Sequence, residues 1–152
     1  MEFQTDNSLL KVSTESTGKP SGEIELHRRL LFEVPDTRTI IHVHPTYTIA
    51  AMYAGLDLQA LSLEFPEIHR YTKVAPNVPI VPAISTELAE ETCLALELTA
   101  SGTISADIVG LERHGVIAVA RDPWTAFEHI ERLEHICQIV LVSGVVKNAF
   151  QK

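Results

Sequence analysis

The stretch Thr39-Ile40-Ile41-His42-Val43-His44-Pro45 decides much of the fold. Its β-branched, alternating residues predict a strand over residues 39–44. Pro45 ends that strand because it has no backbone N–H, and its fixed φ suits the start of a helix. We expect this helix to run through Ala54 and to close at Gly55, the residue type that commonly follows a helix end.

Outward from this stretch, helix and strand alternate along the chain, which indicates an α/β fold. Helices are expected over residues 23–34, 86–99 and from Asp122 onward, and strands over residues 106–111 and 116–120. Thr86 and Asp122 are typical N-cap residues, and Pro123 suits a first helical position. The apolar stripes of the two later helices are expected to comprise Leu88, Cys93, Leu94 and Leu96 in one, and Trp124, Phe127, Ile130, Leu133, Cys137, Val140 and Leu141 in the other.

Two segments carry weaker patterns. Residues 1–22 are polar and are expected to form a loop that ends in Thr17–Gly22. Pro66, Pro76, Pro79 and Pro82 exclude a long regular element between residues 56 and 85. Within that region, residues 79–82 are expected to form a short buried strand.

The composition fits one globular domain, residues 1–152, since 45% of its 152 residues are hydrophobic. The 12 basic and 20 acidic residues give a net charge of −8, which argues against a nucleic-acid partner and against docking on an anionic membrane. We see no signal peptide, and the most apolar stretch, Ile139–Val146, is too short to span a membrane. A soluble, cytoplasmic protein is expected, with Cys93 and Cys137 as buried small hydrophobes rather than a disulfide or a zinc knuckle.

His42 and His44 are two residues apart in the predicted strand, so their side chains point to the same face. Two imidazoles at a strand end can chelate one metal ion, and Zn²⁺ or another borderline divalent metal suits nitrogen ligands. The alternative is two separate structural histidines, and the pattern alone leaves both open. A third ligand is needed, and the candidates are the remaining histidines: His27, His69, His114, His129 and His135.

Among these candidates, His114 differs because it lies in a tight turn between two apolar strands, where α/β proteins place functional groups. Taken alone, it is still better explained as a turn residue. His129 and His135 are expected to be solvated, because they lie beside acidic residues on the long helix. His27 is expected to flank the core, and His69 to lie in a charged surface loop.

Glu23 follows Pro-Ser-Gly at the start of a predicted helix. Its simplest explanation is an acid that complements the helix dipole, and its functional one is a general acid or base beside a metal. Ser21 and Gly22 offer a hydroxyl and a backbone N–H to an anion at this helix start, although an ordinary capping loop has the same pattern.

Taken together, these motifs resemble the class II aldolase/adducin family over roughly the last four-fifths of the chain. The motifs that carry the resemblance are, in order, Lys19-Pro20-Ser21-Gly22-Glu23, Pro35-Asp36, His42-Val43-His44-Pro45, Arg113-His114-Gly115, and Asp122-Pro123-Trp124-Thr125-Ala126-Phe127 with Glu131 and Glu134. The resemblance implies a three-layer αβα domain around a mixed, largely antiparallel sheet.

The resemblance also implies a site. It implies that His42, His44 and His114 bind Zn²⁺ or another divalent metal, that Glu23 is the catalytic acid/base, and that Ser21 binds substrate phosphate. Gly22 stands where the family has a second serine, so one phosphate hydroxyl is missing, although its N–H remains. Members are commonly homotetramers with active sites between subunits.

Compared with the family pattern, the chain is short at its N-terminus. It is expected to be a naturally minimal protein, a protein whose first strands come from elsewhere, or a fragment. The implied activity is a metal-dependent lyase that cleaves a C–C bond of a sugar phosphate or hydroxy-ketone through a metal-stabilised enediolate. The alternatives are a related epimerase, dehydratase or decarboxylase, a non-catalytic adducin-like module, and an unrelated α/β domain with structural histidines.

Overall fold

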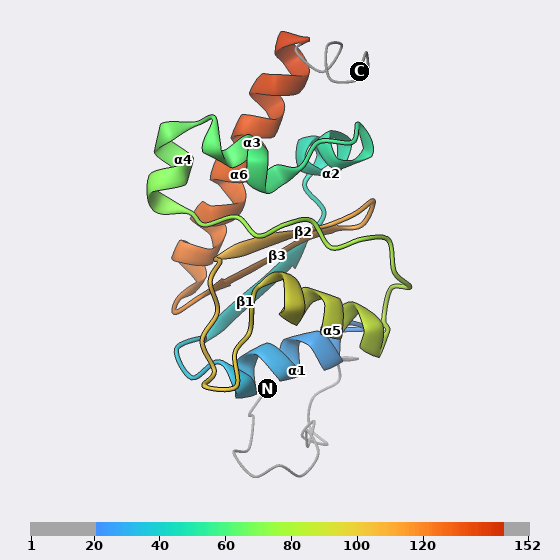
Figure 1. The fold of residues 1–152 in the computed structure, drawn as a ribbon, viewed down its shortest axis with the longest axis vertical. Helices are drawn as coiled ribbons and strands as arrows, with labels where there is room; N and C mark the ends of the chain where they lie inside the picture. The colour runs from blue at the N-terminus through green and yellow to red at the C-terminus, as the bar shows by residue number, and fades with distance from the viewer. Residues whose placement is uncertain (1–20, 145–152) are drawn as a thin grey trace.

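A computed structural model describes residues 21–144, and Figure 1 shows how their helices and strands are arranged. The elements in chain order are α1 (Ile24–Glu33), β1 (Thr39–Val43), α2 (Thr46–Tyr53), α3 (Leu58–Leu63), α4 (Pro66–Tyr71), α5 (Thr86–Ala95), β2 (Ile108–Leu111), β3 (Gly115–Ala120) and α6 (Pro123–Ser143). The predicted loop of residues 1–22 lies outside the described residues except for Ser21 and Gly22, and so do the last residues of the apolar stretch Ile139–Val146.

The central sheet has the strand order β1-β3-β2, and both neighbouring pairs are antiparallel. His42 pairs with Ile117, so the β1–β3 pairing joins two strands that are far apart in the sequence. Two isolated parallel bridges, Val74 to Ile108 and Val78 to Leu111, add to the outer edge of β2. The sheet is therefore mixed and largely antiparallel, which confirms the expected fold class.

The helices cover both faces of the sheet (Figure 1). Successive residues of β3 point to opposite faces, because side chains alternate along a strand. Val116 and Ala118 belong to one apolar core with α2 and α6, whereas Ile117 and Val119 belong to a second core with α1 and α5. The result is a three-layer αβα arrangement in which the sheet separates two cores.

The predicted helices exist, and so do the strands predicted over residues 39–44, 106–111 and 116–120; their ends have identifiable causes. The Asp122 side chain accepts a hydrogen bond from the Thr125 amide and caps α6, with Pro123 in the first turn, as expected. In α5 the cap is Ser85 rather than Thr86, since the Ser85 hydroxyl accepts from the Leu88 amide. This helix ends at Ala95, earlier than predicted, and Glu97 then adopts a left-handed φ of 53°.

The predicted buried strand over residues 79–82 is wrong. Ile80 is 62% exposed, and the buried residue is Val78. The Val78 amide donates to the carbonyl of Gly110, and its own carbonyl accepts from the Glu112 amide. Pro79 and Pro82 have no N–H to continue such a ladder, so the pairing stops at Val78.

The predicted apolar stripes need correction at three positions. Leu94, Trp124 and Phe127 are 71%, 78% and 46% exposed. The buried face of α6 is instead formed by Ala126, His129, Ile130, Leu133, Ile136, Cys137 and Val140. Ala126 is buried in the core that α6 forms with the sheet, whereas the larger Trp124 and Phe127 lie toward solvent. Both cysteines are buried and free, as expected.

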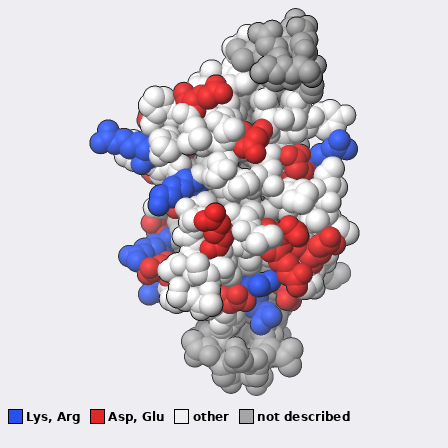
Figure 2. All heavy atoms as spheres, viewed as in Figure 1, with Lys and Arg blue, Asp and Glu red and all other residues white. Residues whose placement is uncertain are grey.

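Charge on the surface is mixed. On the face in Figure 2, acidic side chains gather over α5, and Lys and Arg side chains are scattered around the rim. Among residues 21–144, no helix combines the length and apolarity that a membrane span requires.

Candidate metal centre

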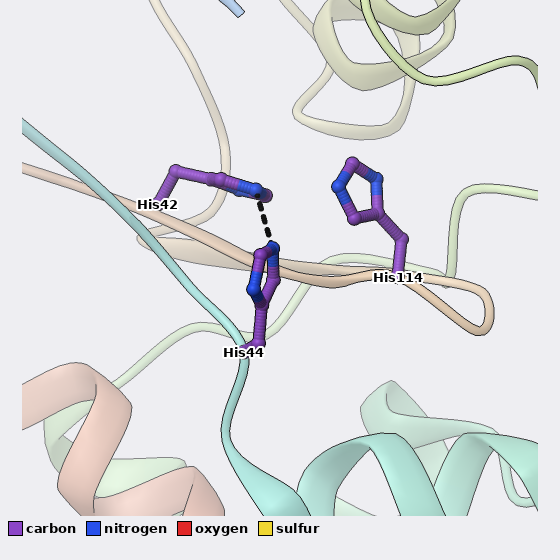
Figure 3. A group of neighbouring side chains, drawn as sticks. All are labelled: His42, His44 and His114. Carbon is purple, nitrogen blue, oxygen red and sulfur yellow. Dashed lines mark hydrogen bonds between the residues drawn. The ribbon is translucent and has the colours of Figure 1, made fainter. Parts of the chain in front are cut away.

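Three imidazoles converge at one end of the sheet. His42 lies in β1, His44 follows β1 directly, and His114 lies in the turn between β2 and β3 (Figure 3). One nitrogen from each ring lies within 4.8 Å of the others, and the Nε2 atoms of His42 and His44 are 3.0 Å apart. Two imidazole nitrogens bound to one tetrahedral Zn²⁺ would be roughly 3.3 Å apart, so the spacing and the donor set fit such an ion.

Gly115 allows the β2–β3 turn to approach β1 closely enough for this convergence. A Cβ at position 115 would lie 2.6 Å from Cδ2 of His44 and closer still to the carbonyl oxygen of Val43. Any side chain there would push His114 away from His44. The sequence Arg113-His114-Gly115 thus places a candidate ligand next to the residue whose small size gives it room.

His42 is held in the neutral form that metal binding requires. Burial, followed in order by the neighbouring His114, His44 and His27, lowers the pKa of His42 to about 4, against an opposing effect of the Val116 backbone. Its Nδ1 atom is buried without a hydrogen-bond partner of good geometry among the described residues. A neutral, partly unsatisfied imidazole is a suitable nitrogen donor.

Glu23 lies beside the three histidines. Its side chain is only 8% exposed, and its Oε1 atom is 3.9 Å from Nε2 of His114. The same Oε1 accepts a hydrogen bond from the Ile84 amide at 3.1 Å. Glu23 occupies the N-cap of α1 but makes no side-chain cap bond, so the simple helix-dipole explanation does not account for its burial.

Ser21 and Gly22 directly precede Glu23, the N-cap of α1. The Ser21 hydroxyl accepts a hydrogen bond from the Glu23 amide at 3.2 Å. A Cβ on Gly22 would lie 2.7 Å from Cδ1 of Ile84. Ile84 has a φ of 60°, which is strained for a β-branched residue. Sequence reasoning missed Ile84, and no local signal marks an isoleucine with a left-handed backbone.

The other four histidines lie outside the group formed by His42, His44 and His114. His27 is half-buried on α1, where burial lowers its pKa against an opposing effect of Glu23. His135 is exposed, as expected. His69 is exposed too, but it lies on α4 rather than in the predicted surface loop. The expectation that His129 is solvated is wrong: it is 5% exposed, and its Nδ1 bonds the Thr72 hydroxyl at 2.8 Å. This contact joins α6 to the end of α4.

Comparison with known proteins identifies the family to which the chain belongs. Residues 2–141 match the family model described as class II aldolase and adducin N-terminal domain. The chain belongs to this family.

Individual relatives support the assignment. The chain is 30% identical over 122 residues to an L-fuculose phosphate aldolase of Methanococcus maripaludis strain C5, covering 80% of this chain and 61% of the relative. It is 26% identical over 132 residues to a 3-oxo-tetronate 4-phosphate decarboxylase of Pectobacterium atrosepticum, covering 85% and 57%. The crystal structure of a sugar-phosphate aldolase from Thermotoga maritima is similar with a TM-score of 0.69 and 25% identity, covering 82% and 54%. The chain therefore spans less than two thirds of the length of each of these three proteins.

Proposed function

We propose that this chain is a metal-dependent lyase of the class II aldolase type, which cleaves a C–C bond of a sugar phosphate or a related hydroxy-ketone. The observation that carries the proposal is the convergence of His42, His44 and His114 beside the buried carboxylate of Glu23. Relatives named L-fuculose phosphate aldolase support the same class of reaction.

In this proposal, His42, His44 and His114 hold Zn²⁺ or another divalent transition metal. When bound, the metal would supply a Lewis acid that polarises the substrate carbonyl and so favours cleavage of the C–C bond. Glu23 takes up the proton that the substrate releases and returns it to the product, because its carboxylate faces the histidines and is held by the Ile84 amide. The Ser21 hydroxyl and the Gly22 N–H bind the substrate phosphate at the start of α1.

A second candidate is an epimerase, dehydratase or decarboxylase that uses the same residues. The relative named 3-oxo-tetronate 4-phosphate decarboxylase favours keeping this candidate. A third is a non-catalytic adducin-like module, since the family description includes adducin. Incubation with sugar phosphates distinguishes the three. Release of an aldehyde by C–C cleavage indicates the lyase, release of carbon dioxide or conversion without cleavage indicates the second candidate, and no turnover indicates the third.

Metal content tests the site directly. After supplementation with Zn²⁺, we expect about one metal per wild-type chain and none in His114→Ala. Glu23→Gln should keep its metal and lose turnover, because Gln fills the same space but cannot accept a proton. Unchanged metal content in His114→Ala would remove His114 from the site, and unchanged turnover in Glu23→Gln would show that Glu23 is not the catalytic acid/base.

We further propose that the chain forms one domain over residues 1–152, works in the cytoplasm and assembles as a homotetramer with active sites at subunit interfaces. The family resemblance supports the assembly, and the free, buried cysteines fit a reducing compartment. Light scattering should give a tetramer at working concentration, and a monomer would contradict the shared site.

A further inference from the structure

We infer that Glu134 is a positioning residue for the metal centre, which acts through α2 to fix His44; this inference rests on the metal-binding function proposed above. Glu134 lies on α6, 87 residues along the chain from the residue Tyr47 that it contacts. It is not one of the three candidate ligands.

Helix α2 begins almost directly after His44, and it lacks a cap of its own. Its N-cap is Pro45, which has no side-chain acceptor, and its first turn has no acidic residue. The first N–H groups of a helix have no partner within that helix, so an uncapped start is expected to fray. For α2, the missing acceptor has to come from another part of the chain.

Glu134 supplies that acceptor. Its Oε1 accepts from the Tyr47 amide at 2.9 Å, and its Oε2 accepts from the Thr48 amide and the Thr48 hydroxyl, both at 2.7 Å. Thr48 is fully buried, and α2 and α6 pack in the same core. A carboxylate with three short donors at a helix N-terminus is a strong, charge-assisted anchor.

The anchor acts on His44 more than on the other two histidines. His44 is exposed and follows the last residue of β1, so the β1–β3 ladder does not hold it. It is joined through Pro45 to the anchored turn of α2, and the proline ring restricts its backbone to extended conformations. His42, by contrast, is paired within the sheet, and His114 belongs to the β2–β3 turn.

The test compares Glu134→Gln with Glu131→Gln, which removes the same charge from an exposed position of the same helix. Zn²⁺ affinity is measured at 25 °C by competition with a chromophoric chelator. We expect Glu134→Gln to weaken Zn²⁺ binding by about 10- to 100-fold, the usual effect of losing a residue that orients a ligand, and Glu131→Gln to match wild type. Wild-type affinity in Glu134→Gln would overturn the inference.

NMR separates failure of this inference from failure of the proposed function. In metal-free protein, the backbone amide signals of His44 should shift in Glu134→Gln while those of β2 and β3 stay in place; a general loss of structure would move both. If wild type binds no Zn²⁺, the proposed function fails, and an unmoved His44 signal would independently overturn the role of Glu134.

Should Glu134→Gln not fold, Thr48→Val removes one of the three bonds, and it should weaken Zn²⁺ binding about five-fold. Unchanged Zn²⁺ affinity in Thr48→Val would then overturn the inference.

Discussion

Replacing Gly115 by alanine should separate the β2–β3 turn from β1. The new Cβ would meet Cδ2 of His44 at 2.6 Å and the Val43 carbonyl even more closely. Ordinary contacts between carbon atoms are about 3.5–4.0 Å, so the two segments must move apart by about 1 Å. We expect a loss of about 1–3 kcal/mol in the free energy of unfolding, the usual cost of overpacking.

The same displacement should weaken metal binding, because it moves His44 away from His114. We expect Zn²⁺ affinity to fall at least about ten-fold. Urea unfolding in the presence of a chelator gives the stability change, and chelator competition gives the affinity.

Gly144→Ala provides the matched control. A Cβ at position 144 meets no atom of residues 21–144 within 4 Å, but the residue has a φ of 72° at the end of α6. This variant should lose about 1 kcal/mol from backbone strain and keep its Zn²⁺ affinity. If Gly115→Ala had wild-type stability and affinity, the close approach of the turn to β1 would not matter, and the reasoning would be refuted.

Three further predictions follow from other contacts. Burial lowers the pKa of His129, so below about pH 6.5 the unfolded chain should bind more protons than the folded one. The free energy of unfolding should therefore fall on acidification. His129→Gln should reduce this fall when urea unfolding at pH 7.5 is compared with pH 5.5. Burial raises the pKa of Cys137 to about 12 and also raises that of Cys93, so neither thiol should be alkylated at pH 8 until urea unfolds the chain, as mass spectrometry can show. Asn77→Ala removes bonds to the Leu56 carbonyl, the Leu58 amide and the Glu112 carboxylate, and should cost about 1–3 kcal/mol by urea unfolding, whereas an unchanged midpoint would contradict a structural role.

Local patterns were enough to predict most elements. Pro45 between β1 and α2, and Asp122 with Pro123 at the start of α6, act within a few residues, so their effects are visible in the sequence. The His42–His44 spacing likewise predicted two side chains on one face of a strand. His114, however, was explained as a turn residue until the family resemblance linked it to the other two.

The errors concern features that only tertiary packing determines. The α6 helix is apolar on more than one side, so periodicity did not reveal that Trp124 is exposed while His129 is buried. The role of Thr72 as the partner of His129 depends on a contact between residues 57 positions apart. The same reason hides the Glu134 anchor and the Glu23–Ile84 bond, which join segments far apart in the sequence.

The strand order β1-β3-β2 has a consequence for how the protein is made. Among the described residues, β1 pairs only with β3, so it has no strand partner until the ribosome has released residues 44–114 and then β3 itself. His42 and His44 therefore leave the ribosome well before His114, and the sheet around them is still incomplete at that stage. Such long-range pairing slows folding and leaves apolar strand edges open during synthesis. The proposed metal site of a nascent chain would be complete only after β3 has paired with β1.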